Sequence, residues 1–72
     1  MKLKDRIAML RQEKGWTQTK MAAEVNRTEA TVRAWETGRA KPTADTLIQL
    51  TQIFNCSMDF LFGFSDERRP KK

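Results

Sequence analysis

Apolar residues recur along this chain with the spacing of helices, and no segment alternates in the manner of a strand. Leu3, Ile7 and Leu10 lie at i, i+4 and i+7, so they share one side of a helix. That helix is expected over residues 3–14, and Gly15 can end it because glycine accepts positive φ without penalty. The other side of this helix is charged, so the pattern predicts one buried stripe and one solvent face.

Two short helical patterns follow, and each opens on a threonine. The hydroxyls of Thr17 and Thr28 can cap the amides of the next turn, which predicts helices over about residues 18–25 and 29–37. Gly38 can end the second helix. Because only Asn26 and Arg27 lie between the first helix and the cap of the second, the second helix must cross the first steeply. This arrangement is typical of a helix-turn-helix, which points to DNA.

Two further helices are expected in the second half of the chain. Leu47, Leu50 and Phe54 recur at i, i+3 and i+7, which predicts a helix over 44–54. A last short helix is expected over residues 58–62, where Ser57 can cap its start and Gly63 can stop it. The predicted class is therefore all-α, with five helices.

The length of 72 residues allows one small domain, expected over residues 1–64. Residues 65–72 form a polar, basic tail that is expected to be disordered. The net charge is +5 and the sequence pI is about 9.9, which favours a polyanionic partner. Ten basic and five acidic groups lie in residues 1–41, so the excess charge accompanies the helix-turn-helix pattern.

Residue types needed for catalysis are missing from the sequence. Histidine and tyrosine are absent, and there is no glycine-rich phosphate loop or cysteine pair, so neither an enzyme nor a metal or other cofactor is expected. Cys56 lies in an apolar stretch and is expected to be a small buried residue. Without a run apolar enough for a signal peptide or membrane span, a cytoplasmic protein is expected.

Many of these residues occur together at spacings found in one family. The run Gly15-x-Thr17-Gln18-x-x-Met21-Ala22 is followed by Thr28-x-x-Thr31-Val32-x-x-Trp35-Glu36-x-Gly38, by Pro42-x-x-x-Thr46-Leu47-x-x-Leu50 and by Ser57-Met58-Asp59-Phe60-Leu61-Phe62-Gly63. Over about residues 3–63 the chain resembles the phage repressor and Cro family, the XRE-type helix-turn-helix proteins. The resemblance implies a compact, lambda-repressor-like bundle of five helices and dimers that bind operators with two-fold symmetry.

The chain departs from the family pattern at the corner of the motif. Asn26 stands where glycine is usual, and asparagine is the next best residue at positive φ, so the turn is expected to survive. Arg27 stands where an apolar residue is usual, which suggests a charge near the DNA backbone. The resemblance also implies a salt bridge between Arg11 and Glu36 that has a structural role.

A helical wheel of residues 29–37 separates a bulky side from an exposed one. The expected base-reading residues lie on the exposed side: Glu29, Ala30, Arg33 and Ala34. Glu29 can accept a hydrogen bond from cytosine, the alanines can meet thymine methyl groups, and Arg33 can bind guanine or a phosphate. The alternative is that Glu29 and Arg33, at i and i+4, form only a solvated surface pair.

Phosphate contacts are expected from polar residues at helix ends and in the basic loop: Gln18, Arg27, Thr28, Thr37, Arg39 and Lys41. The resemblance gives the residue matching Gln18 this role. Trp16 and Trp35 could instead stack on single-stranded bases, but their spacing favours the core.

The aromatic residues near the C-terminus suggest self-association. Once Leu47, Leu50, Phe54, Met58 and Leu61 are assigned to the core, more aromatic surface remains than a short helix can bury. The expected homodimer interface comprises Asn55, Ser57, Phe60, Phe62 and Phe64.

These observations predict a sequence-specific regulator that binds double-stranded DNA. Within that class we expect a phage-type or mobile-element repressor that binds a palindromic operator as a dimer. The alternative is an antitoxin or another protein-interaction module that uses the same fold mainly to bind a protein partner, such as a toxin or a second regulator.

Overall fold

The computed structural model describes residues 1–69 and contains the five predicted helices in order. They are α1 (Leu3–Glu13), α2 (Gln18–Glu24), α3 (Glu29–Thr37), α4 (Ala44–Phe54) and α5 (Met58–Phe62). Each observed range agrees with the predicted one to within a residue, and residues 1–69 contain no strand. The all-α class is confirmed. None of these helices is both long and apolar enough to cross a bilayer.

Side-chain caps explain why most helices begin where the sequence predicts. At the start of α2, α3, α4 and α5 a hydroxyl accepts a hydrogen bond from the backbone N–H three residues later. The capping residues are Thr17, Thr28, Thr43 and Ser57.

Gly63, which ends α5, is required by two features of its surroundings. Its φ is 80°, and a Cβ at this position would lie 1.7 Å from the carbonyl oxygen of Met1. A side chain would therefore push the start of the chain away from α5. The missing side chain at residue 63 thus leaves room for the N-terminal segment beside the last helix.

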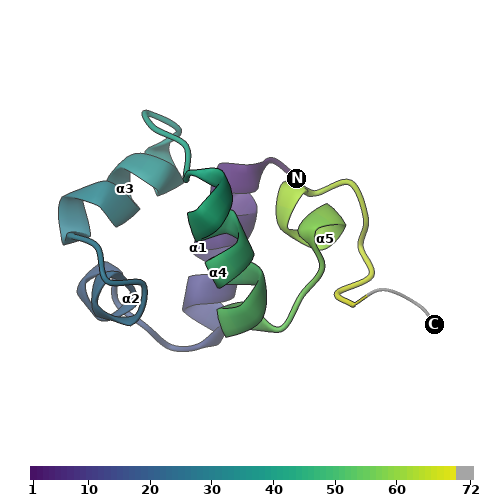
Figure 1. Ribbon diagram of the computed structural model, residues 1–72, viewed down its shortest axis with the longest axis horizontal. Coiled ribbons are helices and arrows are strands. Elements are labelled where there is room, and N and C mark those ends of the chain that lie inside the picture. The colour runs from purple at the N-terminus through teal and green to yellow at the C-terminus, as the bar shows by residue number, and fades with distance from the viewer. Residues whose placement is uncertain (70–72) are drawn as a thin grey trace.

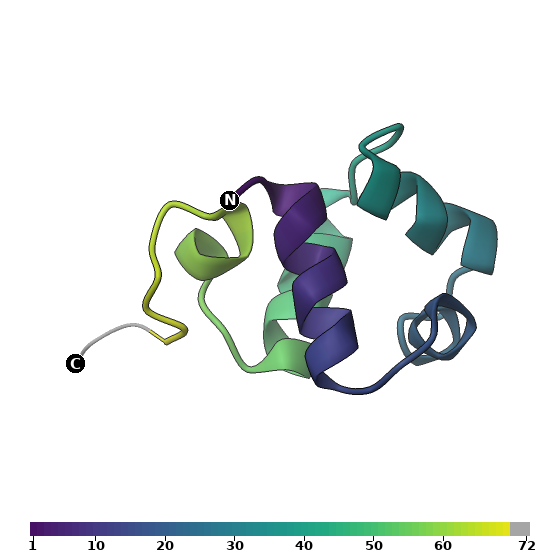
Figure 2. The ribbon, with the colours of Figure 1, turned by 180° about the vertical axis from the view of Figure 1, so that it is seen from behind.

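The helices surround one core, with α1 and α4 lying across the middle of the molecule (Figure 1). In this view α2 and α3 lie on one side, whereas α5 and both chain ends lie on the other. The view from behind shows α1 in front of α4 (Figure 2). The most deeply buried side chains come from every helix or its end: Ile7, Leu10, Met21, Val25, Val32, Leu50 and Leu61. Met21 of α2 and Val32 of α3 are among these residues, so the helix-turn-helix is itself part of the hydrophobic core.

Both tryptophans and the cysteine take the predicted core positions. Trp35 is buried, and the ring centroid of half-buried Trp16 lies 6.0 Å from that of Phe54. Cys56 is buried too, and this burial raises the pKa of its thiol above the usual value. The prediction of a small buried residue at position 56 is confirmed.

The prediction for the α5 side chains was wrong at two positions. Phe60, expected to remain on the surface, is only 4% exposed, whereas Met58, assigned to the core, is 36% exposed. The guanidinium of buried Arg6 lies 3.9 Å from the centre of the Phe60 ring, and that of Arg68 lies 5.1 Å from it. Helical spacing cannot reveal such cover, because both cations come from other parts of the chain.

The first residues after position 64 pack on the bundle. The backbone N–H of Ser57 donates to the carbonyl of Arg68 at 2.7 Å. The Arg68 guanidinium binds both carboxylate oxygens of Glu13, at 2.7 and 3.0 Å. These hydrogen bonds lower the pKa of Glu13 and raise that of Arg68. The rest of the predicted tail, residues 70–72, lies outside the described residues.

Candidate nucleic-acid interface

The corner between α2 and α3 has the backbone that the sequence predicts. Asn26 adopts a φ of 57°, so asparagine takes the left-handed conformation that glycine adopts most readily. The N–H of Arg27 then donates to the carbonyl of Ala22 at 2.8 Å, which closes the end of α2. This tight closure fixes where Thr28 can begin the next helix.

The inner side of α3 is anchored to α1 by a well-shielded ion pair. Arg11 Nε lies 2.7 Å from one carboxylate oxygen of Glu36, and a second guanidinium nitrogen lies 3.1 Å from the other. The side chains are only 13% and 8% exposed. Arg11 also donates to the carbonyl of Trp16 at 2.7 Å, so one guanidinium joins α1, the loop before α2 and the end of α3. The structural salt bridge is confirmed.

The outer side of α3 carries the four predicted base-reading residues. Glu29, Ala30 and Arg33 are exposed, and Ala34 is half-buried. Arg33 donates to one oxygen of Glu29 at 2.7 Å, so the surface pair that the spacing allows is present. The two alanines add little bulk, so the helix backbone can approach a surface closely.

Thr19 is a contributor to this surface that the sequence analysis missed. Its hydroxyl, on α2, donates to the second carboxylate oxygen of Glu29 at 3.3 Å. The carboxylate is therefore held from two helices. No local sequence signal indicates this contact, because it depends on how α2 and α3 pack across the corner.

Two of the predicted phosphate-binding residues differ clearly from the other four. Arg39 and Lys41 lie in the exposed loop after α3, and within residues 1–69 neither side chain makes a hydrogen bond or ion pair. An exposed guanidinium and ammonium group on this loop can accept an anion without first breaking an intramolecular contact.

The other four residues are engaged within the protein. The Gln18 amide donates to Glu36 at 3.1 Å, and the Thr37 hydroxyl donates to the carbonyl of Ala34 at 3.2 Å. Thr28 caps α3, and its hydroxyl also contacts that of Thr31. Arg27 donates to Thr46 on α4 at 3.1 Å, which connects the corner to the next helix.

The predicted dimer residues do not form one continuous set. Asn55 is exposed, half-buried Ser57 caps α5, and Phe60 is buried, as described above. Phe62 and Phe64 instead pack on each other, and their stacked rings have centroids 5.9 Å apart.

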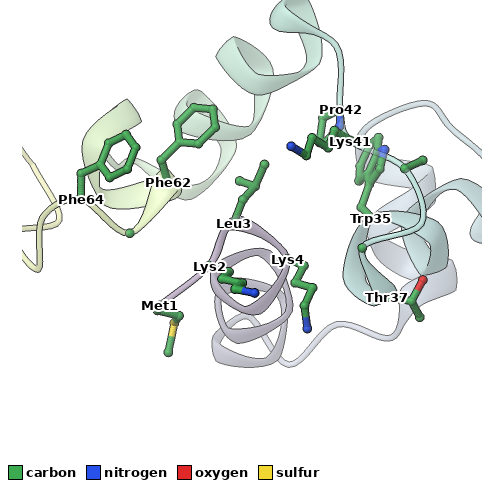
Figure 3. A pocket seen from close by; sticks show the side chains of 13 residues that line it. Met1, Lys2, Leu3, Lys4, Trp35, Thr37, Lys41, Pro42, Phe62 and Phe64 are labelled. Carbon is green, nitrogen blue, oxygen red and sulfur yellow. The ribbon is translucent and has the colours of Figure 1, made fainter.

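The two phenylalanines line an open groove of about 680 Å³ (Figure 3). Figure 3 shows Leu3 between Phe62 and the segment that carries Lys41 and Pro42, with Lys2 and Lys4 beside it at the start of α1. Three lysines lie among the lining residues, and we call this feature the lysine-rimmed groove. In the part of the chain described here, no three His, Cys, Asp or Glu residues are placed to hold a metal ion.

Comparison with known proteins relates this geometry to other chains. A helix-turn-helix family model matches residues 7–61, from α1 to α5. The chain is 33% identical over 63 residues to the HTH-type transcriptional regulator ImmR of Bacillus subtilis, which covers 88% of this chain and 50% of that protein. It is 32% identical over 63 residues to the cryptic phage CTXphi transcriptional repressor RstR of Vibrio cholerae, with coverages of 88% and 56%. The chain thus spans about half the length of these curated relatives.

Proposed function

The chain belongs to the helix-turn-helix family, and from that membership we propose that it is a DNA-binding transcriptional regulator of the phage-repressor type. The names of the two relatives, a transcriptional regulator and a phage repressor, support this role. The proposed activity is binding rather than catalysis.

One observation carries the proposal. The outer side of α3 has a small-residue surface next to a Glu29–Arg33 pair, and the following loop presents two cations without partners among residues 1–69. In a helix-turn-helix the second helix enters the major groove, so this side would meet base edges while the loop meets the backbone. Glu29 would accept from a cytosine amino group, and Arg33 would bind guanine or a phosphate once it leaves Glu29.

The experiment that tests this function is random-site selection with the purified chain, followed by binding measurements at several salt concentrations. A dimer that contacts about 6 to 10 phosphates should show a log–log salt slope of about −5 to −9. Recovery of one motif together with such a slope would support the proposal. A nearly flat salt dependence, or no enriched motif, would remove DNA as the main partner.

We further propose that the operator is palindromic and that the protein binds it as a symmetric dimer. Phe60 is buried, and Phe62 and Phe64 line the groove. The proposed interface therefore differs from the residues that the sequence predicted for it. It now centres on the corner between α4 and α5, where exposed Asn55 and half-buried Ser57 adjoin 36% exposed Met58.

The proposed dimer predicts two measurable results. Half-site centres in the selected motif should be about 10 base pairs apart, so that two α3 helices enter successive major grooves. Sedimentation with Met58→Glu should show weaker self-association than the parent protein. Single-copy binding to a non-palindromic site would contradict the dimer but would leave DNA binding intact.

A further inference from the structure

The lysine-rimmed groove combines apolar surface with positive charge, and exposed Phe64 is not part of the hydrophobic core. Phe64 is 82% exposed although it is aromatic, and its ring stacks on that of half-buried Phe62. Large exposed aromatic surface next to a hollow is typical of an interaction site rather than of an ordinary solvent face. Figure 3 shows that these rings and Leu3 form one wall, which faces the loop after α3.

The charge of the groove is of one sign. Lys2, Lys4 and Lys41 are among its lining residues, and no carboxylate is found among the lining side chains in the described part of the chain. Lys4 has a partner at 3.4 Å in Asp5, which lies outside the lining, whereas Lys2 and Lys41 make no ion pair within residues 1–69. A ligand that fits this surface needs negative groups spaced to meet separate ammonium groups, together with an apolar anchor.

We propose that the lysine-rimmed groove binds an acidic protein segment that carries apolar anchor residues, and that this segment and DNA exclude each other. A second copy of the chain fits poorly, because two grooves meeting across a two-fold axis would bring like charges together. DNA fits poorly as well, since its backbone has phosphates but no large apolar group to cover the Phe62 and Phe64 rings. An acidic amphipathic peptide provides both features.

Exclusion of DNA follows from shared residues. Thr37, Gly38 and Lys41 line the groove and belong to the end of α3 and the loop that we assign to the DNA backbone. A peptide carboxylate on Lys41 would occupy the ammonium group that a phosphate needs, and the other acidic groups of the peptide would repel DNA phosphates at the same loop. This second step rests on the proposed DNA-binding function, whereas peptide binding itself does not.

Selection from a displayed library of random peptides about 12 residues long tests the groove without knowledge of the natural partner. The enriched peptides should contain several Asp or Glu residues and at least two large apolar residues. A fluorescent copy of the best peptide should bind about tenfold more weakly to Phe64→Ser, as expected when an anchor contact is removed. Lys2→Ala should weaken binding several-fold, and this loss should shrink at high salt.

Matched variants control for loss of apolar surface and of charge at other places. Ile48→Ser removes an exposed apolar residue on α4, and Lys14→Ala removes an exposed lysine near the other end of α1. Neither should change peptide affinity. Failure to enrich any peptide family, enrichment without acidic residues, or equal losses in the groove and control variants would overturn the proposal.

The exclusion step is tested by adding the peptide to the complex with the selected DNA site. Release of DNA in proportion to peptide occupancy supports it, and Phe64→Ser should bind the DNA site normally while resisting release. A ternary complex would overturn exclusion. Peptide binding by a chain that selects no DNA site would overturn the proposed function while the groove assignment stands.

Discussion

The two sides of α3 use the same kind of ion pair for opposite purposes. On the inner side Glu36 binds Arg11 of another helix, with side chains 8% and 13% exposed. On the outer side Glu29 binds Arg33 of the same helix, with side chains 46% and 53% exposed, although both pairs have a closest distance of 2.7 Å. Distance therefore does not distinguish them, but shielding from water does.

The difference shows how one short helix can be fixed to α1 on one side and still present replaceable contacts on the other. Breaking the shielded pair would strand a charge away from water, whereas the exposed pair can be exchanged for water or a base edge at small cost. The inner residues thus fix the position of the helix. The outer residues make interactions weak enough to be replaced by base edges in the proposed complex with DNA.

The largest effect is expected from the apolar part of the inner side. Trp35→Ala should lower the free energy of unfolding by about 3–5 kcal/mol, because it removes a buried aromatic ring and leaves a cavity. In a domain of this size such a loss would leave much of the protein unfolded. Urea denaturation followed by circular dichroism measures it. Arg33→Ala is the control on the outer side, and equal losses would contradict the division of α3.

Removal of the charge from the inner ion pair should have the next largest effect. Glu36→Gln should lower the free energy of unfolding by about 1.5–3 kcal/mol, because Arg11 loses its charge-assisted hydrogen bonds. The matched substitution Glu29→Gln should change stability by less than about 0.5 kcal/mol. Denaturation of the two variants side by side checks this difference, and it would be refuted if the surface variant were the less stable.

The outer side should show its effect in DNA recognition instead. Glu29→Gln adds a donor to an acceptor-only group, so the preferred base at one position of each half-site should move from cytosine towards adenine. The original operator should lose about 1–3 kcal/mol of binding free energy. Random-site selection with the variant measures the change. An unchanged motif would mean that Glu29 serves only as the partner of Arg33.

Thr19→Val sharpens this prediction. The substitution removes the hydroxyl that holds Glu29 from α2, but leaves the carboxylate in place. It should broaden the base preference at the same position without moving it.

A smaller and more uniform effect is expected from the loop cations. Lys41→Ala should weaken binding to all DNA sequences alike and flatten the log–log salt slope by about one unit. Titrations at four salt concentrations measure the slope. Lys14→Ala removes an exposed lysine from the end of α1 and should leave it unchanged. A changed sequence motif for Lys41→Ala would show that this residue reads bases.

The smallest effect is expected for an exposed pair far from α3. Bonding to Arg68 lowers the pKa of Glu13, so the folded state binds this proton more weakly than the unfolded state does. The stabilisation is present above the usual pKa of 4.5 and is lost as the pH falls through the lower folded value. The difference in melting temperature between the parent protein and Glu13→Gln should therefore be positive at pH 7 and vanish in strong acid. A difference that grows on acidification would contradict this assignment.

The sequence by itself determined the helices and the frame of the motif. Hydroxyl caps, glycine or asparagine stops and apolar spacing are local signals, which is why helix limits were predicted to within a residue. The burial of Trp35 follows from the same signals, whereas the positive φ of Asn26 was implied by the resemblance to a family with glycine at this corner.

Tertiary structure alone decided which side chains remain available for a partner. Phe60 is covered by Arg6 and Arg68, which approach from α1 and from the C-terminal segment. The hydrogen bond from Thr19 to Glu29 likewise joins residues of different helices. So does the bond from Arg27 to Thr46, whereas Lys41 has no side-chain partner within residues 1–69. Spacing within one helix specifies only the side on which a residue lies, whereas cover by distant residues depends on how all five helices pack.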